Sequence, residues 1–151
     1  MPKVFQFSLQ KVLNLREMVE NTRAQKLKKS QAVLKNEQTR LNDIKNKKAD
    51  FFEGSQTQGS EEQISITDLQ ISQGYLDHLN KKIEDQTSIV SESLEKVAAD
   101  RQEVLAAAKE KMILDKLKER QQSQHQKTLR KKEIQNGSEL ALQRHKTNQD
   151  S

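Results

Sequence analysis

The sequence lacks cysteine and tryptophan and contains one proline and four glycines. Without cysteine, the chain has no disulfide framework, no thiolate metal site and no cysteine nucleophile. Because proline and glycine interrupt helices, their scarcity favours long continuous helices. No apolar run approaches the roughly 18 residues of a membrane span. Residues 1–15 also lack the continuous apolar block of a secretory signal. These absences predict a cytosolic helical protein.

Apolar residues are also scarce, and charged residues are abundant. Each class makes up 32% of the chain. This is too little apolar material for a layered core, although two long helices joined along one narrow face need no more. The same composition is found in disordered chains, so disorder is the competing interpretation. The charge is mixed, with 27 basic and 22 acidic residues. Such mixing is typical of a solvated helix surface.

A seven-residue apolar repeat argues against disorder in the middle of the chain. The repeat has an apolar residue at every seventh position: Leu69, Leu76, Ile83, Val90, Val97 and Val104. A sustained repeat of this kind keeps one stripe of a helix facing a partner helix, as in a coiled coil. The companion positions are mixed. Leu79 and Leu94 are apolar, whereas Gln86, Ser93 and Asp100 lie near the same stripe. We therefore predict a coiled coil with a weak seam.

Two helical segments with a polar connection predict an all-α fold, a long antiparallel two-helix coiled-coil hairpin in a single domain. The first helix is expected over about 8–53, with Ser8 as its N-cap and an apolar stripe through Leu27, Leu34 and Leu41. The stripe lacks a good apolar residue near Glu20 and Arg23. A connecting loop is expected over about 54–66, where glycine and polar residues gather.

The second helix is expected over about 67–136. Thr67 followed by Gln70 forms a capping-box pattern, and Asn136-Gly137 is a favourable C-terminal stop. Residues 137–151 are then expected to fray. At about 1.5 Å per residue, the second helix would outrun the first by roughly 24 residues, beginning near Met112.

Side chains suited to catalysis or metal binding do not form recognisable patterns. The three histidines, His78, His125 and His145, are too widely spaced for a zinc site, and no glycine-rich phosphate loop is present. We therefore predict no enzyme activity, no metal and no cofactor. The best basic clusters, Lys26-Lys28-Lys29 and Arg130-Lys131-Lys132, have no aromatic residue beside them. A basic coiled-coil nucleic-acid-binding protein is therefore an alternative, and a less favoured one.

Three motifs resemble those of the flagellar FliJ proteins. Residues 5–17 read F-x-F-x-L-Q-x-V-L-x-L-R-E, which is similar to the N-terminal signature of the family. Tyr75-Leu76 followed by Leu79 resembles a motif early in the second helix. Residues 114–120 are similar to the L-x-K-L-K-E-R stretch near the C-terminal end. The order and spacing of the motifs match over most of the chain.

This resemblance implies a non-enzymatic component of the flagellar type III protein export apparatus. Family members resemble the central stalk of rotary ATPases. They couple the hexameric export ATPase to the export gate membrane protein, and they also act as chaperone-like factors that meet other export chaperones. The resemblance implies a cytoplasmic protein that associates peripherally with the inner membrane at the flagellar base. A stalk of a non-flagellar type III secretion system is the alternative within the same class.

Candidate partner-binding residues follow from the hairpin and the resemblance together. The N-terminal motif and residues 114–120 are expected to meet at the open end of the hairpin. At this end the candidate contacts with the ATPase are Phe5, Phe7, Leu9 and Leu117. Packing within the hairpin is the alternative role for these residues. For the export gate, the candidates are Tyr75, the only tyrosine, and Leu79.

Overall fold

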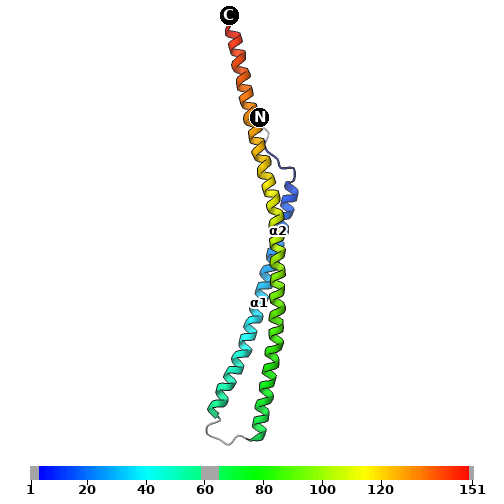
Figure 1. Cartoon of the computed structure of the whole chain (residues 1–151), viewed down its shortest axis with the longest axis vertical. Helices are drawn as coiled ribbons and strands as arrows, with labels where there is room; N and C mark the ends of the chain where they lie inside the picture. The colour runs from blue at the N-terminus through cyan, green and yellow to red at the C-terminus, as the bar shows by residue number, and fades with distance from the viewer. Residues whose placement is uncertain (1–3, 59–64, 150–151) are drawn as a thin grey trace. The chain divides into compact units, whose positions relative to one another are not determined.

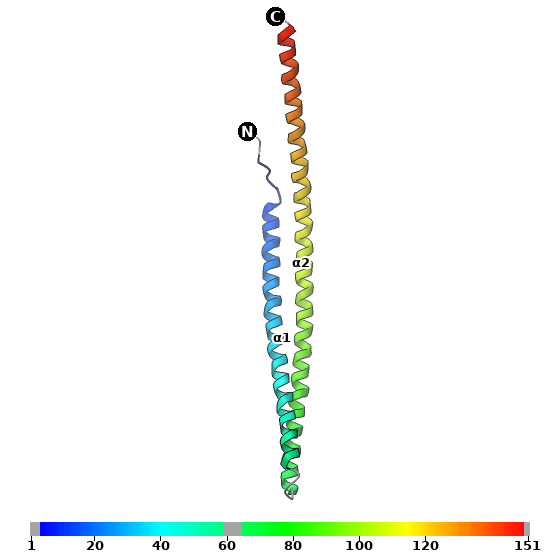
Figure 2. The same cartoon turned by 90° about the vertical axis from the view of Figure 1, so that its left-hand side faces the viewer.

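The computed structural model describes residues 4–58 and 65–149. These residues form two long helices, α1 (Gln10–Gln58) and α2 (Ile66–Gln149), and no strand occurs among them. The two helices pack against each other in an antiparallel arrangement (Figures 1 and 2). The predicted all-α helical hairpin is therefore confirmed.

Contacts divide the chain into two units. Unit 1 comprises Met1–Asn21 with Ala106–Ser151, and unit 2 comprises Thr22–Leu105. Each unit pairs a segment of α1 with a segment of α2. We use the word seam for the line of side chains along which the two helix segments of a unit face each other. The expectation of a single coiled-coil domain stays a prediction.

The seam of unit 2 follows the predicted heptads closely. Its α1 side is made of half-buried residues seven or three apart, among them Leu27, Leu34, Leu41, Ile44 and Phe51. On α2, Leu79, Val90 and Val97 are buried. Leu69 and Leu94, however, are exposed, so their assignment to the seam was wrong. Leu69 lies closer to the start of α2 than Tyr75 does, and the Tyr75 ring contacts Phe51 near the end of α1. The companion positions of the seam are taken instead by polar residues: Ser30, Gln86 and Asp100 are buried.

The seam of unit 1 contains few large apolar side chains. Its buried apolar residues are Phe7, Leu13 and Ala107. Between Leu13 and the end of the α1 segment, the inward positions are occupied by Arg16, Val19 and Glu20, which are half-buried. Near Glu20 the seam is therefore mostly polar, with Val19 as its apolar residue. Small side chains on α2, such as Ala107, let the long polar side chains of α1 cross the seam.

Both helices begin with local hydrogen bonds that differ from the predicted caps. A turn precedes α1, in which the backbone N–H of Gln10 donates to the carbonyl of Phe7 at 3.1 Å. The helix therefore starts two residues after Ser8. At the start of α2, the backbone N–H of Asp68 donates to the Ser65 hydroxyl at 3.1 Å. Ser65, rather than Thr67, is the N-cap, because its oxygen satisfies an N–H of the first turn.

The ends of the helices are also corrected. α1 continues through Gly54 to Gln58, and α2 continues through Gly137 to Gln149. No described glycine has a positive φ, so Gly137 does not adopt the left-handed conformation of a helix stop. An isolated glycine costs only about 1 kcal/mol in a helix, which is too little to end one by itself. Of the predicted connecting loop, residues 59–64 lie outside the described residues.

The longer α1 shifts the pairing of the two helices. Gln10 of α1 contacts Lys118 of α2, and Phe5 contacts His125. The predicted overhang near Met112 was therefore placed too early. Half-buried positions on α2 continue to Leu129, and every residue from Arg130 to Gln149 is exposed. The error came from ending α1 at residue 53, because each residue added to α1 moves its contacts along α2.

Candidate functional site

The segment before α1 packs onto α2 through its two aromatic residues. Phe7 is only 6% exposed. The Phe5 ring lies 5.6 Å from the His125 ring, centre to centre, with the planes tilted by 45°. This geometry lies within the range of favourable aromatic contacts. Of the predicted contact residues, Phe5 therefore contacts α2 in this structure, and Phe7 is buried.

The other two residues predicted to contact the ATPase lie close to the same end of unit 1. Leu9 is exposed beside the first turn of α1, and Leu117 is half-buried on α2. Between them, the Lys118 ammonium donates a hydrogen bond to the Gln10 amide oxygen at 2.8 Å. The structure thus brings the N-terminal motif and residues 114–120 together, as the sequence predicted.

Beyond this contact, no other described helix packs against α2. Residues 130–149 are all exposed, and they include Ile134, Leu140 and Leu142. Five basic and two acidic residues give this segment a net positive charge. A helix that buries no face gains little stability from tertiary packing. We call residues 130–149 the exposed C-terminal helix. It contains the basic cluster Arg130-Lys131-Lys132.

The residues predicted to meet the export gate lie near the loop end of unit 2. The Tyr75 ring is partly exposed, and it lies 4.9 Å from the Phe51 ring with the planes tilted by 58°. Leu79, one helical turn later, is only 3% exposed. Tyr75 therefore keeps part of its surface exposed while it contacts Phe51, whereas Leu79 is buried in the seam.

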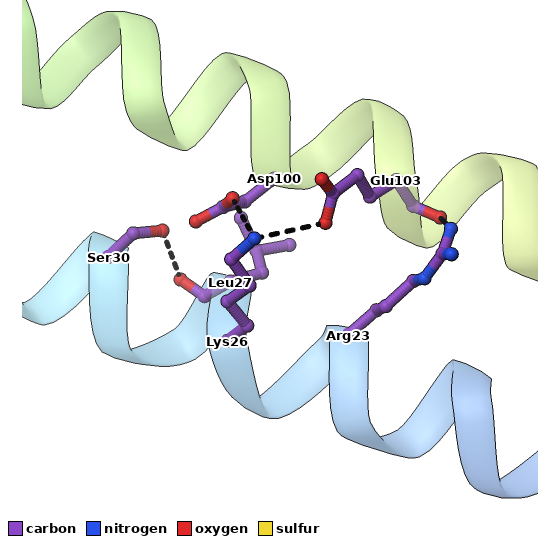
Figure 3. Close-up of polar contacts among 6 residues, drawn as sticks. All are labelled: Arg23, Lys26, Leu27, Ser30, Asp100 and Glu103. Atoms are coloured by element: carbon purple, nitrogen blue, oxygen red, sulfur yellow. Dashed lines mark hydrogen bonds and ion pairs between the residues drawn. The ribbon is translucent and has the colours of Figure 1, made fainter.

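A cluster of charged residues crosses the seam of unit 2 (Figure 3). The Lys26 ammonium lies 3.3 Å from a Glu103 carboxylate oxygen and 3.6 Å from Asp100 Oδ1. The hydrogen bond with Glu103 is the main cause that raises the pKa of Lys26 above its ordinary value of 10.5, and the negative charges of Glu103 and Asp100 raise it further. Arg23 donates to the Glu103 backbone carbonyl at 3.3 Å. Lys26 is thus engaged in ion pairs across the hairpin.

Asp100 is the most deeply buried charged residue of this cluster. It is 3% exposed, and its Oδ2 atom has no hydrogen-bond partner among the described residues. A second polar crossing joins Gln86 and Glu37: the Gln86 amide N–H donates to the Glu37 backbone carbonyl at 3.0 Å and also to the Glu37 carboxylate. Buried polar residues in a coiled-coil seam select one alignment of the helices, because any shifted alignment leaves them without partners.

Three contacts of these sites were not predicted from the sequence. They are the contact of Phe5 with His125, that of Tyr75 with Phe51, and the hydrogen bond of Lys118 with Gln10. Each depends on the pairing of α1 with α2. Extending α1 past Gly54, which one glycine does not prevent, would have moved the predicted pairings toward the observed ones.

Among the residues 4–58 and 65–149, no group of three or more His, Asp or Glu side chains could hold a metal ion. The long hairpin presents paired side chains along its length, and its prominent features are aromatic pairs, ion pairs and an exposed basic helix. The fold and these sites define a coiled-coil protein whose surfaces suit binding.

The family model of the flagellar FliJ protein matches residues 5–150. The chain therefore belongs to the FliJ family, and the match covers nearly its whole length. This family is a non-catalytic one, related to flagellar protein export. No curated protein and no solved structure matches the chain. Among the described residues, no helix is both long and apolar enough to cross a lipid bilayer.

Proposed function

We propose that this protein couples the flagellar export ATPase ring to the export gate, and that it does so without catalytic activity of its own. Its membership of the FliJ family carries this proposal. The family resemblance implies the two partners, a hexameric ATPase and a gate membrane protein. It also implies a chaperone-like role toward other export chaperones and a position at the cytoplasmic side of the inner membrane.

The exposed C-terminal helix supports a partner at the open end of unit 1. Residues 130–149 are helical and exposed, with apolar side chains at Ile134, Leu140 and Leu142. A surrounding protein ring would bury these side chains and stabilise a helix against which no other described helix packs. Leu9 and Leu117 lie where such a ring would end, so both remain candidate ATPase contacts.

We propose that the two aromatic residues before α1 contribute to the ATPase contact at the open end of unit 1. Phe5 is half-buried against His125, and Phe7 is buried. In the proposal, they hold residues 4–9 in place so that Leu9 is presented to the ATPase. Phe5 retains exposed surface and can contact the ring directly. Phe7 acts through the packing that it provides.

A pull-down with the purified export ATPase tests the ATPase contact. The double variant F5D/L9D should bind at least about tenfold more weakly, because charges replace apolar contacts that are worth about 1 kcal/mol or more each. Circular dichroism should remain helical. The matched control is L69D, which places a charge at an exposed leucine of unit 2. Unchanged ATPase binding by F5D/L9D would remove these residues from the site.

The gate contact is tested separately at Tyr75. We propose that the exposed edge of the Tyr75–Phe51 pair contacts the gate, with Leu79 supporting it from within the seam. Tyr75→Ala should weaken binding to the cytoplasmic part of the gate while ATPase binding stays unchanged. Ile71→Ala, at an exposed residue one turn earlier, is the control. Intact gate binding by the Tyr75 variant would contradict the assignment.

A further inference from the structure

One flank of unit 1 exposes apolar side chains on both helices around an ion pair. Arg16 of α1 pairs with Glu110 of α2 across this flank, and both side chains are partly exposed. Residues three, four or seven positions apart share a helix face. Val12 and Val19 therefore flank Arg16 on α1. Ile113 and Leu117 likewise follow Glu110 on the same side of α2. We call this surface, including Leu15, the Val12 flank.

Packing in the seam leaves the apolar residues of the Val12 flank exposed or only half-buried. Leu15 is 57% exposed and Ile113 is 68% exposed. Val12 is also exposed, whereas Val19 and Leu117 are half-buried at the edge of the seam. Contiguous exposed apolar side chains rimmed by polar ones typically mark an interaction surface.

Their spacing fits a third helix. Val12, Leu15 and Val19 are three and four residues apart, and Ile113 and Leu117 are four apart. This is the spacing with which helices present side chains to one another in coiled coils. A helix lying along the junction of the two segments would contact both rows, as in recognition of an amphipathic helix by a groove.

The charges around the flank indicate the sign of the partner. Glu110 is already paired with Arg16. The other charged residues bordering the flank are exposed and basic: Lys11, Lys109, Lys116 and Arg120. A second copy of the chain docking through the same surface would place basic rim against basic rim, which is unfavourable. An apolar helix bordered by acidic residues complements this surface.

We propose that the Val12 flank binds an amphipathic helix with acidic borders from a partner protein. This goes beyond the proposed coupling of ATPase and gate, because it places a third binding surface on the side of unit 1. Of its residues, only Leu117 is shared with the proposed ATPase contact.

The test uses two synthetic 21-residue helical peptides, titrated with the full chain and followed by fluorescence anisotropy. Both peptides carry leucine at the apolar positions. One has glutamate at the bordering positions and the other has lysine. The acidic peptide should bind at least about tenfold more tightly, and added salt should weaken it, because charge complementarity sets the preference.

Variants locate the binding surface. L15S/I113S should weaken binding of the acidic peptide by about tenfold or more, since two apolar anchors are lost. The matched control L105S/M112S changes two apolar residues with comparable exposure that fall outside the two rows, so binding should not change. ATPase binding by L15S/I113S, measured in the same pull-down, should also stay unchanged. This separates failure of the present proposal from failure of the coupling function.

Several results would overturn the proposal. They are an acidic peptide that does not bind, equal binding of the two peptides, or equal losses in the two double variants. A concentration-dependent dimer that L15S/I113S alone abolishes, measured by sedimentation equilibrium, would assign the flank to a second copy. Binding to phosphatidylglycerol vesicles that L15S/I113S alone abolishes would assign it to a membrane surface.

Discussion

The two units of the chain differ in what they bury along their seams. Unit 2 buries the polar side chains Ser30, Gln86 and Asp100 in a seam where apolar residues are usual. In unit 1 the buried residues are Phe7, Leu13 and Ala107, all of them apolar. Buried polar groups restrict which helices can pair and in which alignment. The contrast indicates that the buried polar groups of unit 2 specify how its two helix segments align.

The largest effect is expected from a buried apolar residue of unit 2. Leu79→Ala should lower the free energy of unfolding by about 2–3 kcal/mol, because it removes well-packed methyl groups from the seam. Leu94→Ala makes the same chemical change at an exposed position and should cost less than about 0.5 kcal/mol. Urea denaturation followed by circular dichroism measures both. Equal losses would show that the seam does not dominate stability.

The next largest effect tests whether the hydrogen bonds between Gln86 and Glu37 in unit 2 select the alignment of its α1 and α2 segments. The double variant E37L/Q86L should raise the free energy of unfolding by about 1–3 kcal/mol, because buried polar groups are replaced by apolar contacts. The variant should also lose its single association state and form dimers or larger species in sedimentation experiments. A more stable chain that stays strictly monomeric would contradict the selective role of Gln86 and Glu37.

A smaller effect on the free energy of unfolding is expected from replacing the glycines of α2. It should differ between Gly74, in the part of α2 that pairs with α1, and Gly137, in the exposed C-terminal helix. Gly74 and Gly137 both lie within α2, and a Cβ added at either meets no atom within 4 Å. Gly74→Ala should raise the free energy of cooperative unfolding by about 0.5–1 kcal/mol. Gly137→Ala should raise only the helix content at low temperature, since no other helix in the described part of the chain packs against residues 130–149. Urea denaturation and circular dichroism distinguish the two outcomes, and a similar gain in cooperative stability for Gly137→Ala would contradict the comparison.

The smallest effect concerns the ion pairs of Lys26 at high pH. Its pKa is raised in the folded chain above 10.5, mainly through the hydrogen bond with Glu103. The contribution of Lys26 to stability is therefore fully present below that value, and it is lost as the pH rises through the folded pKa. The stability of the Lys26→Met variant should fall less than that of the wild type as the pH rises above 10.5. Thermal unfolding as a function of pH measures the difference, and parallel curves would show that the pairing contributes nothing.

Much of the hairpin could be predicted because heptad periodicity is a local property of the sequence. Leu76, Ile83, Val90 and Val97 lie in or at the seam as expected. Leu94 was misplaced because its spacing from Leu79 fits a companion position only approximately. The predicted helix ends were wrong because a single glycine, at Gly54 or Gly137, costs too little to stop a helix.

The sequence by itself determined the helices, the antiparallel hairpin and the family to which the chain belongs. Period, composition and motifs all act within short stretches of chain, so they can be recognised without coordinates. Only the tertiary structure decided which residues of α1 and α2 face each other. That pairing depends on where each helix ends and on buried polar crossings such as Gln86 with Glu37. It therefore also decided that Phe5 contacts His125 and that the Val12 flank brings apolar residues of both helices together.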